Sequence, residues 1–144
     1  MTDAFETSLR IEAEPEQVFD HFTNPELMVK WMGEFARLQA VEDGLFSVDI
    51  DGVLIRGSYR TLDRPRFIEI AWGEAGNAQM PPGSTCLTIS LEPSDSGTLL
   101  TLKHSGLVPD EAEKHAYGWP HFLARLAIAS TGGEPGPYPW NAST

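Results

Sequence analysis

The sequence predicts an α+β domain in which an antiparallel sheet packs against helices. Two short helical segments follow a first strand, residues 35–104 alternate between apolar and polar positions with turn residues between the runs, and a helical region follows them. Alternation with a period of two indicates half-buried strands, and strands joined by short turns form an antiparallel meander. We therefore expect one strand, two short helices, a meander of about six strands and a long helix against the sheet.

Local signals near the N-terminus define the first strand and the two short helices. Side chains from Phe5 to Ile11 alternate as expected for a strand with one covered face. Pro15 then opens the first helix, because a proline at the first helical position loses no hydrogen bond. Asn24-Pro25 opens the second helix with asparagine as the N-cap, and Gly33 is its expected C-terminal stop.

The meander is read from alternating runs and the turns between them. Asp51-Gly52 is a tight hairpin signal between the apolar alternations of residues 46–50 and 53–59. Residues 73–84 are rich in glycine and proline, and we expect a mobile loop there, near an opening. The remaining predicted strands cover residues 68–72, 87–91 and 100–104.

The last helical region is predicted to begin at Pro109, with Asp110 as the N-cap. Gly118 and Pro120 should break or kink it, because an internal proline removes a hydrogen bond and crowds the preceding turn. Beyond them, five residues fall on one side at helical spacing: Trp119, Phe122, Leu123, Leu126 and Ser130. We assign residues 1–131 to a single domain. Residues 132–144 form a Pro/Gly-rich tail, with Tyr138 and Trp140 as its candidate packing residues.

The charge balance excludes several classes of partner. The formal net charge is −11 at pH 7, from 21 acidic and 10 basic side chains. Nucleic acid and anionic membranes are bound by concentrated positive charge, so neither is an expected partner. Residues 1–6 do not resemble a secretory signal, no segment approaches the length of an apolar membrane span, and Cys86 is the only cysteine. We expect a cytoplasmic protein without membrane insertion.

An ordered set of short motifs resembles a known family. The motifs are Pro15-Glu16-Gln17-Val18-Phe19, Asn24-Pro25-Glu26, Lys30-Trp31, Asp51-Gly52, Gly57, Ile68-Glu69-Ile70-Ala71-Trp72, Gly97-Thr98, Leu100-Thr101-Leu102-Lys103-His104-Ser105-Gly106 and Gly118-Trp119. From about Thr7 to Ser130, their order and spacing resemble the AHSA1-like family of the START-like (SRPBCC) superfamily. The resemblance implies a helix-grip fold, in which a curved antiparallel sheet wraps a long C-terminal helix around a cavity.

The candidate ligand-binding residues are those expected to point into this cavity. A curved sheet over one helix leaves a space whose size depends on the inward side chains, and these can also fill it completely. The twelve candidates are Trp31, Phe46, Val48, Ile55, Tyr59, Ile70, Trp72, Leu102, His104, Trp119, Phe122 and Leu126.

His104 is the one titratable group that the alternation places on the inner face. It can be a buried neutral histidine with a structural role, an anchor for a ligand, or a general base. The Tyr59 hydroxyl can likewise orient a ligand. The four histidines show no zinc-site spacing, and no phosphate-binding loop, dinucleotide fingerprint or nucleophile elbow is present, so we expect no metal, no cofactor and no assigned catalytic residue.

These observations favour a module that binds a small apolar or aromatic molecule between the sheet and the last helix. One alternative, suggested by other START-like proteins, is a cyclase- or dehydratase-like enzyme with His104 and Tyr59 as an acid/base pair. A second, suggested by the family name, is interaction with an Hsp90-type chaperone. A homodimer is left open. The sequence favours binding over catalysis but does not decide between them.

Overall fold

A computed structural model describes residues 3–136, which form seven strands and three helices. In chain order they are β1 (Asp3–Ile11), α1 (Pro15–Thr23), α2 (Pro25–Met28), β2 (Phe35–Leu38), β3 (Leu45–Ile50), β4 (Val53–Asp63), β5 (Phe67–Trp72), β6 (Thr85–Ser94), β7 (Gly97–Leu107) and α3 (Pro109–Ser130). The predicted order of one strand, two short helices, six further strands and a last helix is confirmed.

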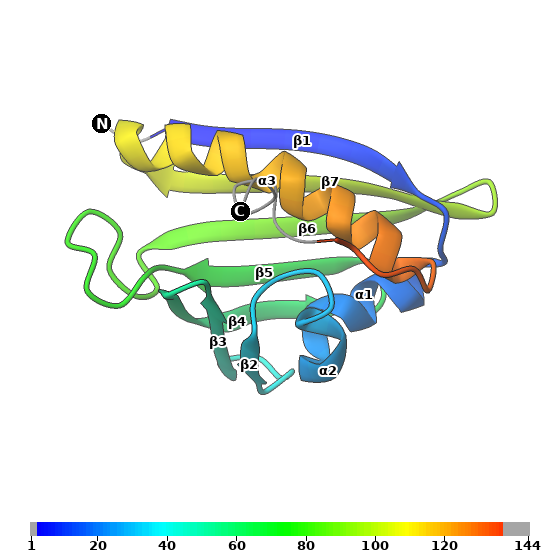
Figure 1. Cartoon of the computed structure of the whole chain (residues 1–144), viewed down its shortest axis with the longest axis horizontal. Coiled ribbons are helices and arrows are strands. Elements are labelled where there is room, and N and C mark those ends of the chain that lie inside the picture. The colour runs from blue at the N-terminus through cyan, green and yellow to red at the C-terminus, as the bar shows by residue number, and fades with distance from the viewer. Residues whose placement is uncertain (1–2, 137–144) are drawn as a thin grey trace.

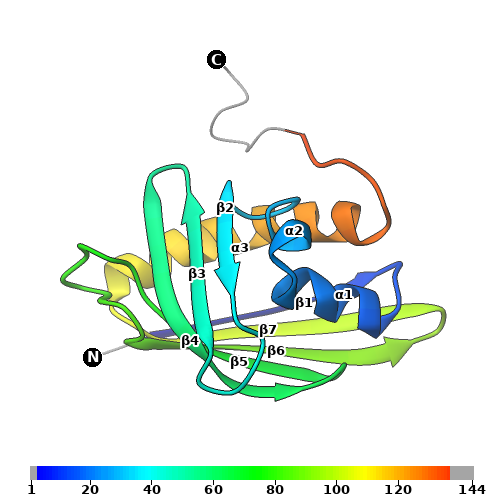
Figure 2. The ribbon, with the colours of Figure 1, turned by 90° about the horizontal axis from the view of Figure 1, so that it is seen from below.

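All seven strands belong to one antiparallel sheet in the order β1-β7-β6-β5-β4-β3-β2. The long helix α3 crosses one face of this sheet (Figure 1). Seen from below, the sheet curves so that β3 and β4 turn toward the side on which α3, α1 and α2 lie (Figure 2). This is the helix-grip arrangement that the sequence predicts.

The predicted strand register is confirmed on β6 and β7. Leu87, Ile89 and Leu91 are buried on β6, and their partners across the pair are His104, Leu102 and Leu100 on β7. Because side chains alternate between the faces of a strand, these residues share the covered face. His104 therefore lies on the inner face, as expected.

Two features of β4 allow the sheet to bend. The pairing with β5 shifts between Tyr59 and Thr61, which marks an irregularity of the kind that increases local bending. At Gly57 the strands approach closely, since a Cβ atom there would lie 1.7 Å from the Ala71 carbonyl oxygen. Only glycine fits such a position.

The structure corrects three details of the predicted helices. Helix α2 ends at Met28, earlier than expected, and turns lead to Gly33, which has a φ of 87°. The N-cap of α3 is Val108 and not Asp110, because Pro109 already occupies the first helical position. Helix α3 does not break at Gly118 or Pro120. Helical stability depends mainly on packing, and α3 buries Trp119 and Leu123 on either side of Pro120.

Some expectations concern the ends of the chain or the surface. Tyr138 and Trp140 lie outside the described residues. Among the helices of residues 3–136, none combines the length and hydrophobicity that crossing a bilayer requires. In the same range, His, Cys, Asp and Glu side chains form no group of three arranged to hold a metal ion.

Candidate functional site

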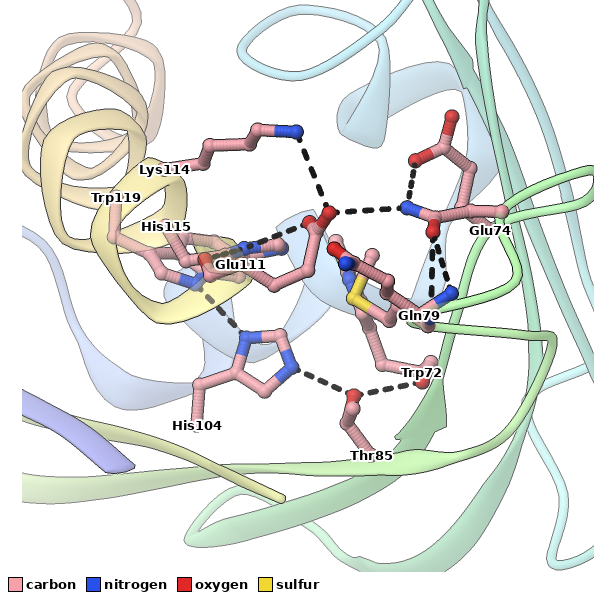
Figure 3. A network of polar contacts seen from close by, with 11 residues as sticks. Trp72, Glu74, Gln79, Thr85, His104, Glu111, Lys114, His115 and Trp119 are labelled. Carbon is pink, nitrogen blue, oxygen red and sulfur yellow. Dashed lines mark hydrogen bonds and ion pairs between the residues drawn. The ribbon is translucent and has the colours of Figure 1, made fainter. Parts of the chain in front are cut away.

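A pocket of about 390 Å³ lies between α3 and the part of the sheet near the β3–β4 hairpin. Most of its lining residues belong to this hairpin, the end of β5, the loop of residues 73–84 and α3. The lining residues are Met32, Ile50, Asp51, Val53, Ile55, Trp72, Glu74, Met80, Glu111, Lys114, His115, Gly118, Trp119 and Phe122. Side chains of α3 face those of the loop across this space (Figure 3). The volume lies in the range of small-molecule sites.

Four of the twelve sequence candidates line this pocket: Ile55, Trp72, Trp119 and Phe122. The other eight are buried in the core outside the lining: Trp31, Phe46, Val48, Tyr59, Ile70, Leu102, His104 and Leu126. Large side chains therefore fill the interior behind the pocket, and the open space lies beside residues 73–84.

His104 is held in a buried chain of hydrogen bonds that joins the sheet to α3 (Figure 3). Trp119 Nε1–H donates to His104 Nδ1 at 3.1 Å, and His104 Nε2 lies 2.8 Å from Thr85 Oγ1. The Thr85 hydroxyl donates to the Trp72 carbonyl oxygen at 2.7 Å. An indole can only donate and a carbonyl can only accept, so the proton of a neutral His104 must be on Nε2.

The environment of His104 favours this neutral form. Burial, and to a smaller extent the neighbouring His115, lowers the pKa of His104 from 6.5 to about 3. Both ring nitrogens already have partners, and His104 is not among the residues that line the pocket. The arrangement fits the structural role among the three that the sequence left open.

Tyr59 has a similar role at the other end of the core. Its hydroxyl donates to the Phe22 carbonyl oxygen at 2.7 Å, and burial raises the pKa of this phenol well above 10.0. Trp31 Nε1–H donates to the His21 carbonyl oxygen at 2.9 Å nearby. These bonds fasten α1 and the segment after α2 to the core. The Tyr59 hydroxyl is thus bonded to α1, whereas the His104 ring is bonded to β6 and α3.

The polar side of the pocket centres on Glu111, in the first turn of α3. Its side chain is 4% exposed, and its Oε2 accepts from Asn77 Nδ2 at 3.2 Å and from Lys114 Nζ at 3.4 Å. His115 Nδ1 lies 2.7 Å from the Glu111 carbonyl oxygen, so it carries the proton that this bond requires. Burial lowers the pKa of His115, and the contacts with Glu111 partly offset that effect.

The loop of residues 73–84 is folded over this side of the pocket and is tied to the rest of the domain. Asn77 Oδ1 accepts from the backbone amides of Gln79 and Met80, while its amide group donates to Glu74 and Glu111. Met80 is buried against the pocket. The loop therefore contributes to the lining of the pocket, and the mobility expected of it stays a prediction.

Sequence reasoning missed Glu111, Lys114, His115, Met80 and Glu74 as lining residues. One signal was present: positions 111, 115 and 119 repeat at a spacing of four, which places them on one helix face. The expected break at Gly118 and Pro120 hid that continuity. The inward position of Met80 depends on the path of a loop, for which the sequence carries no periodic signal.

A second hollow, of about 490 Å³, lies between α1 and the C-terminal end of α3. Its lining includes Glu12, Asp20, Lys30 and Thr131 and is mainly polar. It lacks the aromatic walls of the first pocket, although its volume is larger. Apolar and aromatic walls with a few polar groups are typical of small-molecule sites, so the pocket beside α3 is the better candidate.

The sequence matches a known protein family over most of its length. Residues 12–130 match the family model described as activator of Hsp90 ATPase homolog 1-like protein. The chain belongs to this AHSA1-like family. The match covers both helices after β1, the meander and the whole of α3, so the pocket lies inside the AHSA1-like region. Among curated proteins, none matches this sequence.

Solved structures agree with that assignment. An AHSA1-like protein from Rhizobium etli is 33% identical, with a TM-score of 0.77 over 99% of this chain and 90% of that one. A protein from Mesorhizobium loti is 20% identical, with a TM-score of 0.81 over 92% of this chain and 100% of that one. The Aha1 dimer from Colwellia psychrerythraea is 21% identical, with a TM-score of 0.79 over 92% and 99%. The last two show likeness of fold alone.

Proposed function

We propose that this AHSA1-like protein binds a small apolar or aromatic molecule in the pocket between the sheet and α3. The observation that carries the proposal is the pocket of about 390 Å³ beside Trp72, Trp119 and Phe122. Aromatic side chains provide large apolar contact areas with preferred ring geometries, which suits a flat or ring-shaped ligand. The family name does not carry the proposal, because one fold hosts many functions.

Binding is favoured over catalysis by the two residues that the sequence singled out. A cyclase- or dehydratase-like reaction using His104 and Tyr59 would require that they exchange protons with a substrate. Both are instead fully buried, and their polar atoms are engaged in hydrogen bonds within the core. The binding proposal needs neither residue to react.

The proposal is tested by titrating the ¹⁵N-labelled protein with naphthylmethanol, a neutral aromatic probe. We expect saturable shifts of the backbone amides of Val53, Glu74, His115 and Gly118, all of which line the pocket. Tryptophan emission should change over the same concentration range, because Trp72 and Trp119 form its walls. Shifts confined to the hollow near Thr131, or no saturable shift with a panel of neutral aromatic probes, would reject it.

Self-association is a separate expectation, taken from the Aha1 protein whose solution structure is a dimer. Sedimentation equilibrium over a wide concentration range measures it directly. A single monomeric mass at every concentration would contradict a homodimer and would not bear on ligand binding in the pocket.

A further inference from the structure

One oxygen atom of the buried Glu111 carboxylate has no hydrogen-bond donor. The two donors that reach this side chain, Asn77 Nδ2 and Lys114 Nζ, both bind Oε2. His115 Nδ1 lies 3.9 Å from Oε1, but its proton is directed to the Glu111 carbonyl oxygen. Within residues 3–136, no side chain or backbone amide donates to Oε1. Buried carboxylates are normally paired and hydrogen-bonded, so this atom has unused capacity to accept a hydrogen bond.

The position of Glu111 makes this capacity available to a ligand. The residue is 3% exposed, and it lines the pocket. It projects from the first turn of α3 into the space between this helix and the loop that carries Glu74 (Figure 3). A donor group on a molecule bound in the pocket can reach Oε1, and hydrogen bonds to charged groups are stronger than those between neutral groups.

The charges around the pocket favour a cation. Its lining contains three carboxylates, from Asp51, Glu74 and Glu111, and one ammonium group, from Lys114. The Lys114 side chain is 72% exposed, so solvent screens its charge and it compensates the buried carboxylate only in part. An anionic ligand would be repelled by this set of charges, and a cationic one attracted.

The walls fit the rest of such a molecule. Trp72, Trp119 and Phe122 offer apolar surface next to the carboxylate. A cation near an aromatic face gains further electrostatic attraction. From the open Oε1 atom, the excess of carboxylates and the aromatic walls, we propose that the pocket takes an aromatic amine, whose ammonium group binds Glu111 Oε1. This inference rests on the proposed function, and it adds that the ligand carries a positive charge on an ammonium group.

Three probes with one aromatic body test the inference in the full chain: naphthylmethylamine, naphthylmethanol and naphthoate. Calorimetric titration at neutral pH should rank the amine first, the alcohol second and the acid last. A hydrogen bond to a charged group changes a dissociation constant by about tenfold or more, and we expect this ratio between amine and alcohol. Equal binding of amine and alcohol, or tighter binding of the acid, would overturn the inference.

Glu111→Gln keeps the shape of the side chain and an acceptor for Asn77 but removes the charge. It should reduce the preference for the amine to about threefold or less while the affinity for naphthylmethanol stays within about threefold. Glu113→Gln is the matched control, since Glu113 is exposed on the same helix and outside the pocket lining. It should keep the wild-type preference. An unchanged preference in Glu111→Gln would overturn the inference.

Lys114→Met provides a second variant if Glu111→Gln does not fold. Removing the ammonium group that donates to the Glu111 carboxylate should tighten naphthylmethylamine severalfold relative to naphthylmethanol. Unaltered amine binding in Lys114→Met would contradict the role of Glu111. The two proposals fail differently: binding of naphthylmethanol without a preference for the amine rejects only the inference, whereas binding of none of the three probes rejects the proposed function as well.

Discussion

The buried His104 should make the protein less stable as the pH falls below neutrality. In the folded protein its pKa is lowered to about 3, whereas an exposed histidine in the unfolded chain has a value of 6.5. Between these two values the unfolded state binds a proton that the folded state does not, so stability is fully present above pH 6.5 and decreases as the pH falls toward about 3. The lowered pKa of His115 acts in the same direction.

The size of the effect follows from the two pKa values. With folded and unfolded values of about 3 and 6.5, His104 alone should reduce the free energy of unfolding by about 2 kcal/mol between neutral pH and pH 5. Urea unfolding followed by tryptophan emission, at pH 7.5 and at pH 5, measures the change as a difference between two transitions.

His104→Gln separates this contribution from that of every other titrating group. Glutamine carries a donor and an acceptor but does not titrate, so the variant should start about 1 to 3 kcal/mol less stable at neutral pH and then lose about 2 kcal/mol less than wild type on acidification. If wild type and His104→Gln lost the same free energy between the two pH values, our description of a neutral, fully bonded His104 would be refuted.

Three further substitutions and one control test the fold and the pocket. Gly57→Ala should abolish or severely weaken folding, measured by thermal denaturation, because its Cβ would meet the Ala71 carbonyl oxygen. In the control Gly118→Ala the new Cβ has open space, and the variant should stabilise α3 by about 0.5 to 1 kcal/mol. Equal melting temperatures of the two variants would contradict the close approach at Gly57. Asn77→Ala should speed hydrogen exchange in residues 73–84 and leave the sheet unchanged, and unaltered exchange there would remove its role in the loop. Trp72→Ala should lower the free energy of unfolding by about 3 to 5 kcal/mol and weaken naphthylmethanol binding. Full affinity in a folded variant would contradict the contact between Trp72 and the ligand.

The sheet could be predicted from the sequence because its alternation is tied to burial. A shift of one residue on β6 would move Leu87, Ile89 and Leu91 to the outer face, so only one register buries them. The same argument placed His104 inside. Helical spacing after Pro109 indicated the last helix, and the family motifs added the curvature of the sheet, which alternation alone does not specify.

The polar side of the pocket could not be predicted in this way. An acidic residue such as Glu111 in the first turn of a helix is explained by the helix dipole alone, without burial. It is buried because residues 73–84 fold back over it through Asn77, a contact between segments 34 positions apart in the chain. The path of such a loop depends on tertiary packing, which local sequence patterns do not predict.

The buried chain from Trp119 through His104 and Thr85 to the Trp72 carbonyl oxygen also constrains how this protein can change during evolution. Each of the first two side chains gives a donor to the next, so replacing His104 alone by an apolar residue leaves an indole N–H without an acceptor. Replacing His104 and Trp119 together by apolar residues of matching size avoids this cost. Natural variants should therefore exchange these two positions as a pair, and the wall of the pocket that Trp119 forms would change in the same step.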